Sequence, residues 1–239
     1  MKKLLLSFLL IAAATGIVSA QKTINDPNVE KRTVGSFHGI DVATGIELLL
    51  SEGATEEVAV SAVTTEFRDK IVTKIENGIL KIYYETKTGA INKTKETKDL
   101  KAYVSYKTLD LLEANTGARV KISGVLKSAS LSLKANTGAS VDGEVDIASL
   151  KVDQNTGSKV TLSGKADKLE IDGDTGSKFK GEDMATSNCN ATVSTGAIVT
   201  VTAEKELQAK ASTGGSVKYK GSPVIKEIKR NTGGSVNKI

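Results

Sequence analysis

Apolar and polar residues alternate along most of this chain with a period of two, the pattern of β-strands that bury one face. The alternation is clear in Arg119-Val120-Lys121-Ile122 and again in Lys168-Leu169-Glu170-Ile171. It predicts many short strands and little helix.

The predicted strands are organised by a four-residue phrase, a small polar residue followed by Thr, Gly and a small residue. The copies begin at Asn115, Asn136, Asn155, Asp174, Ser194, Ser212 and Asn231. Their Gly residues are separated by 21, 19, 19, 20, 18 and 19 positions. So regular a period indicates stacked structural repeats.

Each copy of the phrase lies between two apolar positions. Three residues after Gly come Val120, Val141, Val160, Phe179, Val199, Val217 and Val236, and four residues before Thr come Leu112, Leu133, Val152, Ile171, Ala191, Ala209 and Ile228. Each repeat is therefore predicted to be strand, turn, strand, with Thr and Gly at the centre of a type II turn. A second corner is predicted at Ser123-Gly124, Ser163-Gly164, Lys180-Gly181 and Lys220-Gly221.

A period of about 19 residues has room for two or three strands of about five residues, but not for helical repeats of more than 30 residues. We therefore expect an all-β fold, a parallel β-solenoid, right-handed by the crossover rule. Leucine-rich repeats are excluded because no Leu-x-x-Leu-x-Leu recurs in register, and calcium-binding nonapeptide repeats because Gly-Gly-x-Gly-x-Asp is absent.

The same pattern occurs once more near the start, where Ile40, Thr44-Gly45 and Leu48 have the repeat spacing. A small insertion of strands and a helix then separates this first coil from the others. Its predicted parts are a strand at 58–63, a short helix from 64 or 65 to 71, a hairpin turn at Asn77-Gly78, a strand at 79–84 and a further strand containing Tyr103 or Val104. Residues 87–98 lack apolar periodicity and are predicted to form an exposed loop.

The first 20 residues have the features of an export signal: Lys2 and Lys3, an apolar run, and a small-x-small site with cleavage after Ala20. Residues 21–33 are polar and are predicted to form a flexible leader, and 34–239 a single solenoid domain. No Cys follows the cleavage site, which argues against a lipid anchor, and no other apolar run could span a bilayer. We expect an exported protein without a membrane span, in the periplasm, on the cell surface or secreted.

The composition excludes several classes of function. With 33 Lys and Arg against 28 Asp and Glu, the charge is too balanced to predict nucleic acid as a partner. The single His38 and single Cys189 lie far apart, so no metal cluster, no cofactor and no catalytic Cys-His or Ser-His-Asp arrangement is predicted. Cys189 takes the position of Leu150 and Leu169 in other repeats, which favours a buried apolar role over a reactive thiol.

At this point the residues indicate a family. Phe37, Gly39-Ile40, Val42 and Gly45-Ile46-Glu47-Leu48, then Ile75-Glu76-Asn77-Gly78, and finally Gly233-Gly234-Ser235-Val236 carry the resemblance. Residues 34–239 resemble the head GIN domain of putative autotransporter adhesins, common in exported proteins of Bacteroidetes. The resemblance implies a β-solenoid, export and an adhesive role, and it supplies no catalytic residues.

The favoured function is accordingly an exported, non-catalytic surface or periplasmic module for binding or adhesion. The alternative is an envelope polysaccharide-active enzyme, a lyase or hydrolase on a β-helix. Outward Asp153, Glu170 and Asp172 could supply its two carboxylates. Lys134, Lys151 and Lys168 are interleaved with them, however, and Trp is absent, so a solvated face of mixed charge is favoured.

A stripe of cations is predicted on the strands that follow the turns, at the second and fourth positions after Gly. Its members are Arg119, Lys121, Lys159, Lys178, Lys180 and Lys218. Coils stacked about 4.8 Å apart would align these residues for a polyanion such as an acidic polysaccharide or another envelope component. The stripe is interrupted by Asp142 and Glu144 and later by Ile198 and Thr200, so a solubilising surface without a partner is the other interpretation. Self-association through the C-terminal coil, which ends at Ile239, is also predicted.

Overall fold

The computed structural model describes residues 26, 28–85 and 97–239. The predicted export signal with Ala20, residues 21–25 and 27 of the leader, and 86–96, which include most of the predicted loop, lie outside the described residues. The elements are β1 Glu30–Arg32, β2 Gly39–Val42, β3 Glu47–Glu52, β4 Glu57–Ser61, α1 Thr65–Arg68, β5 Ile71–Glu76, β6 Ile79–Tyr84, β7 Lys101–Tyr106, β8 Leu111–Ala114, β9 Arg119–Ala135, β10 Ser140–Gln154, β11 Lys159–Gly173, β12 Lys178–Val193, β13 Ile198–Ala211, β14 Ser216–Lys220, β15 Val224–Arg230 and β16 Ser235–Lys238.

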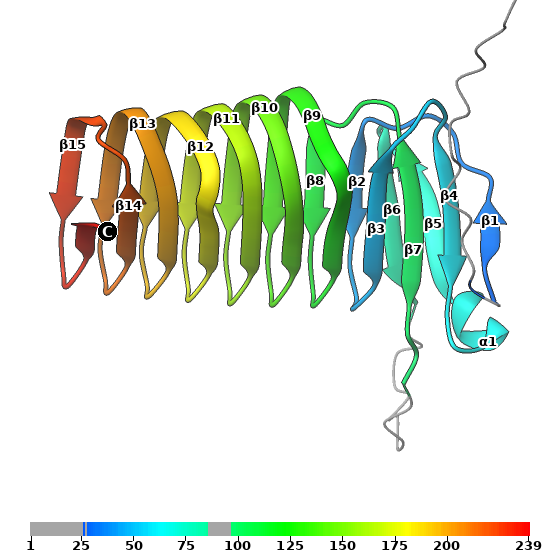
Figure 1. The fold of residues 1–239 in the computed structure, drawn as a ribbon. Helices are drawn as coiled ribbons and strands as arrows, with labels where there is room; N and C mark the ends of the chain where they lie inside the picture. The colour runs from blue at the N-terminus through cyan, green and yellow to red at the C-terminus, as the bar shows by residue number, and fades with distance from the viewer. Residues whose placement is uncertain (1–25, 27, 86–96) are drawn as a thin grey trace, which may run out of the picture.

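The strands form one parallel β-solenoid, as the repeat predicted. Successive coils stack side by side along a single axis, with tight turns along one edge and wide arches along the other (Figure 1). We call the strand segments that follow each Thr-Gly turn the first face, and those that precede each turn the second face. Neighbouring coils pair in parallel and in register on both faces, for example Val141 with Val160 and Val152 with Ile171.

The second corner differs from the prediction. From β9 to β13 the chain stays extended around the arched edge, so each coil has one long bent strand there instead of two strands with a turn. Gly124, Gly164 and Gly221 do adopt positive φ at this edge, whereas Gly181 does not. A Cβ at Gly164 would collide with the carbonyl oxygen of Val145, so only Gly fits there.

The core is the row of inward side chains from the two faces. On the first face Val160 and Phe179 pair directly and are almost completely buried, which confirms the register predicted from the repeats. Cys189 pairs with Leu169 and Leu207 inside the second face. Burial raises the pKa of its thiol to about 12, so Cys189 is an apolar core residue in this fold.

The Thr-Gly turns are of a different type from the one predicted. Eight Thr residues from Thr44 to Thr232 have φ between 45° and 58°, and the Gly residues that follow them have φ between 69° and 74°. Positive φ at both central positions is the signature of a type I′ turn, whereas a type II turn requires it only at the second. A β-branched residue in this region costs on the order of 1–2 kcal/mol, so something outside the turn must hold Thr there.

Hydrogen bonds between coils provide that restraint. The Gly138 N–H donates to the carbonyl oxygen of Thr156 in the next coil at 2.9 Å, and the Thr137 carbonyl accepts from Gly117 in the preceding coil at 2.9 Å. Bonds of this kind run from Gly45 to Thr232, with lengths of 2.9 to 3.2 Å. We call this series the turn ladder. It extends the hydrogen bonding of the strands through the turns, so the central peptide of each turn lies along the stack.

The insertion covers the N-terminal end of the solenoid with antiparallel strands. The Asn77-Gly78 turn joins β5 to β6 as predicted, and Thr64 caps α1 by accepting a hydrogen bond from the Phe67 N–H. The helix ends at Arg68, three residues earlier than predicted. Within the predicted flexible leader, β1 is ordered and pairs antiparallel with β4, a correction to that assignment.

Replacing Gly157 by Val should lower the free energy of unfolding by about 1–3 kcal/mol, because Gly157 has a φ of +70°. A Cβ there would meet nothing within 4 Å, so the whole cost is conformational. Gly157→Asn is the matched control, since Asn tolerates positive φ, and it should lose clearly less. Urea unfolding measures both variants. Equal losses for Val and Asn would show that φ is not the cause.

Candidate functional site

The structure divides the predicted cation stripe into separate groups. Arg119, Lys159 and Lys178 share one row of the first face, where Ser140 separates Arg119 from Lys159. Lys121, Lys180 and Lys218 share the neighbouring row, with uncharged or acidic residues between them: Asp142, Thr161 and Thr200. The six side chains are exposed, but they do not form one continuous stripe.

Only Lys159, Lys178 and Lys180 are brought together. Lys159 and Lys178 are direct partners on adjacent coils, and Lys180 lies two residues farther along the same strand. We call these three residues the lysine cluster. Lys121, by contrast, donates to Glu47 at 2.6 Å, so its charge is already matched.

The residues directly opposite the lysine cluster on the neighbouring coils are uncharged. Its register partners on the neighbouring coils, besides its own members, are Ser140, Thr161, Ile198 and Thr200. Within the part of the chain that the structure describes, no carboxylate lies within 4.0 Å of the three ammonium groups. Like charges directly opposite on paired strands destabilise a sheet, so the cluster lowers the stability of the protein when no ligand is bound.

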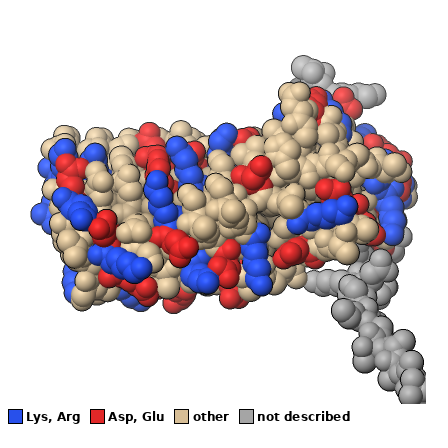
Figure 2. Space-filling model, turned by 90° about the horizontal axis from the view of Figure 1, so that it is seen from above, with Lys and Arg blue, Asp and Glu red and all other residues tan. Residues whose placement is uncertain are grey.

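The rest of the surface carries charges of both signs. Seen from above the arched edge, basic and acidic side chains are interleaved along the solenoid (Figure 2). Lys165 pairs with Asp146 at 3.3 Å and Lys220 with Glu182 at 3.3 Å. Opposite charges are therefore paired along this edge, and the lysine cluster differs from it.

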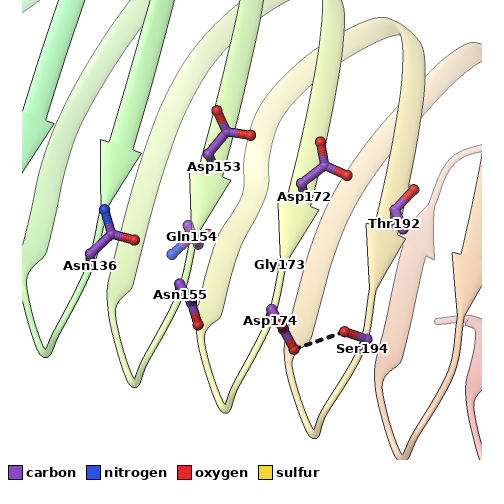
Figure 3. Close-up of a pocket in the computed structure, with 9 residues that line it drawn as sticks. All are labelled: Asn136, Asp153, Gln154, Asn155, Asp172, Gly173, Asp174, Thr192 and Ser194. Atoms are coloured by element: carbon purple, nitrogen blue, oxygen red, sulfur yellow. Dashed lines mark hydrogen bonds between the residues drawn. The ribbon is translucent and has the colours of Figure 1, made fainter.

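A second feature is an open pocket on the second face, beside the turns (Figure 3). Its volume is about 340 Å³. It is lined by Asn136, Asp153, Gln154, Asn155, Asp172, Gly173, Asp174, Thr192 and Ser194. The lining therefore consists of carboxylates, amides, hydroxyls and one Gly, without an aromatic ring or a large apolar side chain.

The pKa values of two carboxylates in this pocket are shifted in opposite directions. Partial burial and the neighbouring Asp153, its register partner, raise the pKa of Asp172 above its ordinary value. Hydrogen bonds from the hydroxyls of Thr195 and Ser194 lower the pKa of Asp174. On the same face Lys151 lies 3.6 Å from Glu170 and 3.9 Å from Asp153, as the interleaving of charges predicted. Lys168 is not in these rows, because its partners are Ser149 and Asn188.

The single histidine has a structural contact. His38 Nδ1 lies 2.7 Å from Asp110 Oδ1, and this hydrogen bond raises the pKa of the exposed imidazole. Among the described residues no group of three or more His, Cys, Asp or Glu side chains could hold a metal ion. Over the same residues, the structure contains no helix with the length and hydropathy needed to cross a membrane.

Comparison with known proteins identifies the family. The family model described as putative auto-transporter adhesin, head GIN domain, matches residues 36–223. The chain belongs to this family. The resemblance read from Gly45-Ile46-Glu47 and the repeats is thereby confirmed. Among proteins of curated function, none matches the chain significantly.

Solved structures share the fold of this head GIN domain. A putative adhesin from Bacteroides fragilis has a TM-score of 0.77 and 19% identity, covering 88% of this chain and 96% of that chain. A putative adhesin from Parabacteroides merdae has a TM-score of 0.66 and 17% identity, covering 89% of this chain and 95% of that chain. A putative lipid binding protein from Parabacteroides distasonis has a TM-score of 0.64 and 16% identity, covering 90% of this chain and 97% of that chain. At these identities the likeness shows the fold alone.

Replacing Asp172 by Asn should stabilise the protein near neutral pH and have no effect in strong acid. Because the folded-state pKa of Asp172 is raised, stability falls as the pH rises above 3.8, where the unfolded carboxyl ionises first, and stays lower above the folded pKa. An Asn side chain cannot ionise, so the Asp172→Asn variant does not lose this stability. Thermal unfolding at about pH 7 and about pH 2 measures it, with the exposed Asp167→Asn as control. If Asp172→Asn is less stable than the parent at neutral pH, the assignment is contradicted.

Proposed function

We propose that this chain is an exported, non-catalytic binding or adhesion module that holds an acidic polysaccharide of the cell envelope against its first face. The observation that carries the proposal is the lysine cluster, three adjacent cations without a matching carboxylate among the described residues. A polyanion laid across the coils would remove their mutual repulsion. The flat, rigid face suits an extended polymer better than a compact ligand.

Membership of the head GIN family supports the general role. Its description names adhesins, and an adhesive protein must reach the cell surface or the space outside the inner membrane. The apolar N-terminal segment with cleavage after Ala20 is consistent with that route. We include export to the periplasm, the surface or the medium in the proposal, and N-terminal sequencing of the protein from fractionated cells tests it.

The remaining members of the predicted stripe have lesser roles in this proposal. Ser140 separates Arg119 from the lysine cluster, Thr200 separates Lys218 from it, and Lys121 is paired with Glu47. They could contact the outer parts of a long polymer. We assign the affinity to Lys159, Lys178 and Lys180.

One observation favours the alternative, a polysaccharide-active enzyme. The pocket of the second face contains Asp172 with a raised pKa and Asp174 with a lowered pKa, the division of roles that an acid and a base require. Yet the pocket has no apolar wall against which a sugar ring could pack. Asp174 Oδ1 also accepts from the Thr175 N–H and the Ser194 hydroxyl of the turns, so it serves the turn structure. Binding without catalysis is the better supported function.

Changing Lys159, Lys178 and Lys180 together to Glu should abolish binding to an acidic polysaccharide such as polygalacturonate. The parent protein should bind it at about 0.01 M salt and more weakly at about 0.15 M, because exposed charges are screened. Binding to neutral dextran should be absent in both. Affinity electrophoresis or calorimetry measures these differences.

The matched control is the triple change of Lys127, Lys168 and Lys205 to Glu. These lysines are exposed, lie outside the lysine cluster and carry the same total charge change. The control should retain binding to polygalacturonate. If it loses binding as fully as the cluster variant, only net charge matters. If the parent does not bind at low salt, the proposal fails.

Self-association through the C-terminal coil belongs to the proposal as a second interaction. Three of the four exposed large hydrophobic residues in the described chain lie there, namely Val224, Ile225 and Ile239. Arg230 partly covers this end by donating to the carbonyl oxygen of Val236 at 2.7 Å, and Val236 is buried. The contact that we propose between two copies uses the outer strand β15, which carries Val224 and Ile225.

A further inference from the structure

The C-terminal coil contains a strand with one unused edge. Among the described residues β15 pairs only with β13, whereas β1, β4, β5 and α1 cover the other end of the solenoid. An unpaired strand edge can receive another strand. Val224 and Ile225 are 62% and 41% exposed on this strand, an apolar surface that nothing in the described chain covers.

The lysines and the glutamate of β15 do not block such pairing, because they are matched within the chain. Arg230, the last residue of the strand, instead donates to the carbonyl oxygen of Val236. Lys226 lies 3.1 Å from Glu206, and Glu227 bonds with both Lys210 and Lys229. The lysines of an edge strand ordinarily discourage association. Here each has a carboxylate partner, so the strand offers nearly neutral pairs together with its apolar residues.

The inward and outward positions of β15 are arranged symmetrically about the middle of the strand, between residues 226 and 227. The register with β13 has an irregularity between Leu207 and Gln208, which leaves Lys226 as an extra residue beside Glu227. Ile225 and Ile228 pair with the inward Leu207 and Ala209, whereas Val224 and Glu227 pair with the outward Glu206 and Gln208. An antiparallel copy centred between residues 226 and 227 therefore places Ile225 opposite Ile228 and Lys226 opposite Glu227.

We propose that two copies of this chain associate tail to tail through antiparallel pairing of β15 with β15 in this register. Each dimer contains two Lys226–Glu227 pairs and two Ile225–Ile228 pairs, with no like charges directly opposite. The contact is isologous, as expected for a closed two-fold dimer. The sheet of the second face then continues from one copy into the other.

The dimer has a consequence for binding that rests on the proposed function. A two-fold axis that relates antiparallel strands is perpendicular to their sheet, so it leaves each face on the same side. The two lysine clusters therefore lie on one side of a solenoid of double length. A polyanion long enough to reach both is held at two points, which raises its overall affinity without a new contact.

Complementary charge variants test the register. Lys226→Glu places Glu opposite Glu, and Glu227→Lys places Lys opposite Lys. Each variant alone should dimerise about tenfold more weakly than the parent, because two like-charged pairs replace two opposite ones. An equimolar mixture should restore association, since each copy then faces opposite charges. Sedimentation equilibrium over a range of concentrations measures all three samples.

Lys127→Glu is the control, a single charge change on an exposed lysine away from β15, and it should dimerise like the parent. Circular dichroism shows whether the two β15 variants remain folded. A parent protein that stays monomeric at the highest concentration overturns the proposal, and so does a mixture that associates no better than its components. If the protein is monomeric and still binds polygalacturonate, the dimer proposal is wrong and the proposed function is retained.

Discussion

The hydrogen bond from each turn Gly to the Thr carbonyl of the next coil is the interaction on which the structure depends. It makes the turns part of the same ladder as the strands, so adjacent coils cannot slip relative to one another at the turn edge. The Gly157 N–H, for example, donates to Thr175 at 3.0 Å. Because this bond requires the central peptide to lie along the stack, Thr156 is held at a φ of 46°, where Thr is otherwise strained.

A stack in strict register has two consequences for its side chains. Inside the solenoid, the register stacks Val160 on Phe179 and Leu169 on Cys189. These stacked side chains fill the narrow core without a Trp. Outward, the register also forces like charges together when adjacent coils carry the same residue type, as with Lys159 and Lys178 or Asp153 and Asp172. The first pair has no carboxylate to relieve it among the described residues. This contrast is why the lysine cluster supports a ligand better than the pocket does.

Much of the fold could be predicted from the sequence because the repeat is local. The spacing of Thr-Gly turns determines which residues stack, and this spacing alone assigns Phe179 and Cys189 to the core. The turn type could not be predicted, because positive φ at Thr depends on bonds to neighbouring coils rather than on its own preferences. The β1 strand was missed for a similar reason, since its three residues are held by pairing with β4 and by the contact of Glu30 with Arg68, both distant in sequence. The gaps in the stripe were visible in the sequence, but the neutralisation of Lys121 was not, because position alone does not show that Glu47 pairs with it.

Amide hydrogen exchange at the turn glycines tests the turn ladder most directly. Gly138, Gly157 and Gly176 are exposed to solvent, so without the ladder their N–H groups would exchange at rates close to those of an unstructured chain. With the ladder in place, we predict that these amides are protected nearly as strongly as the core amides of β10 and β11. Rapid exchange at these three glycines, with the strand amides still protected, would show that the turns are not joined to one another and would contradict this prediction.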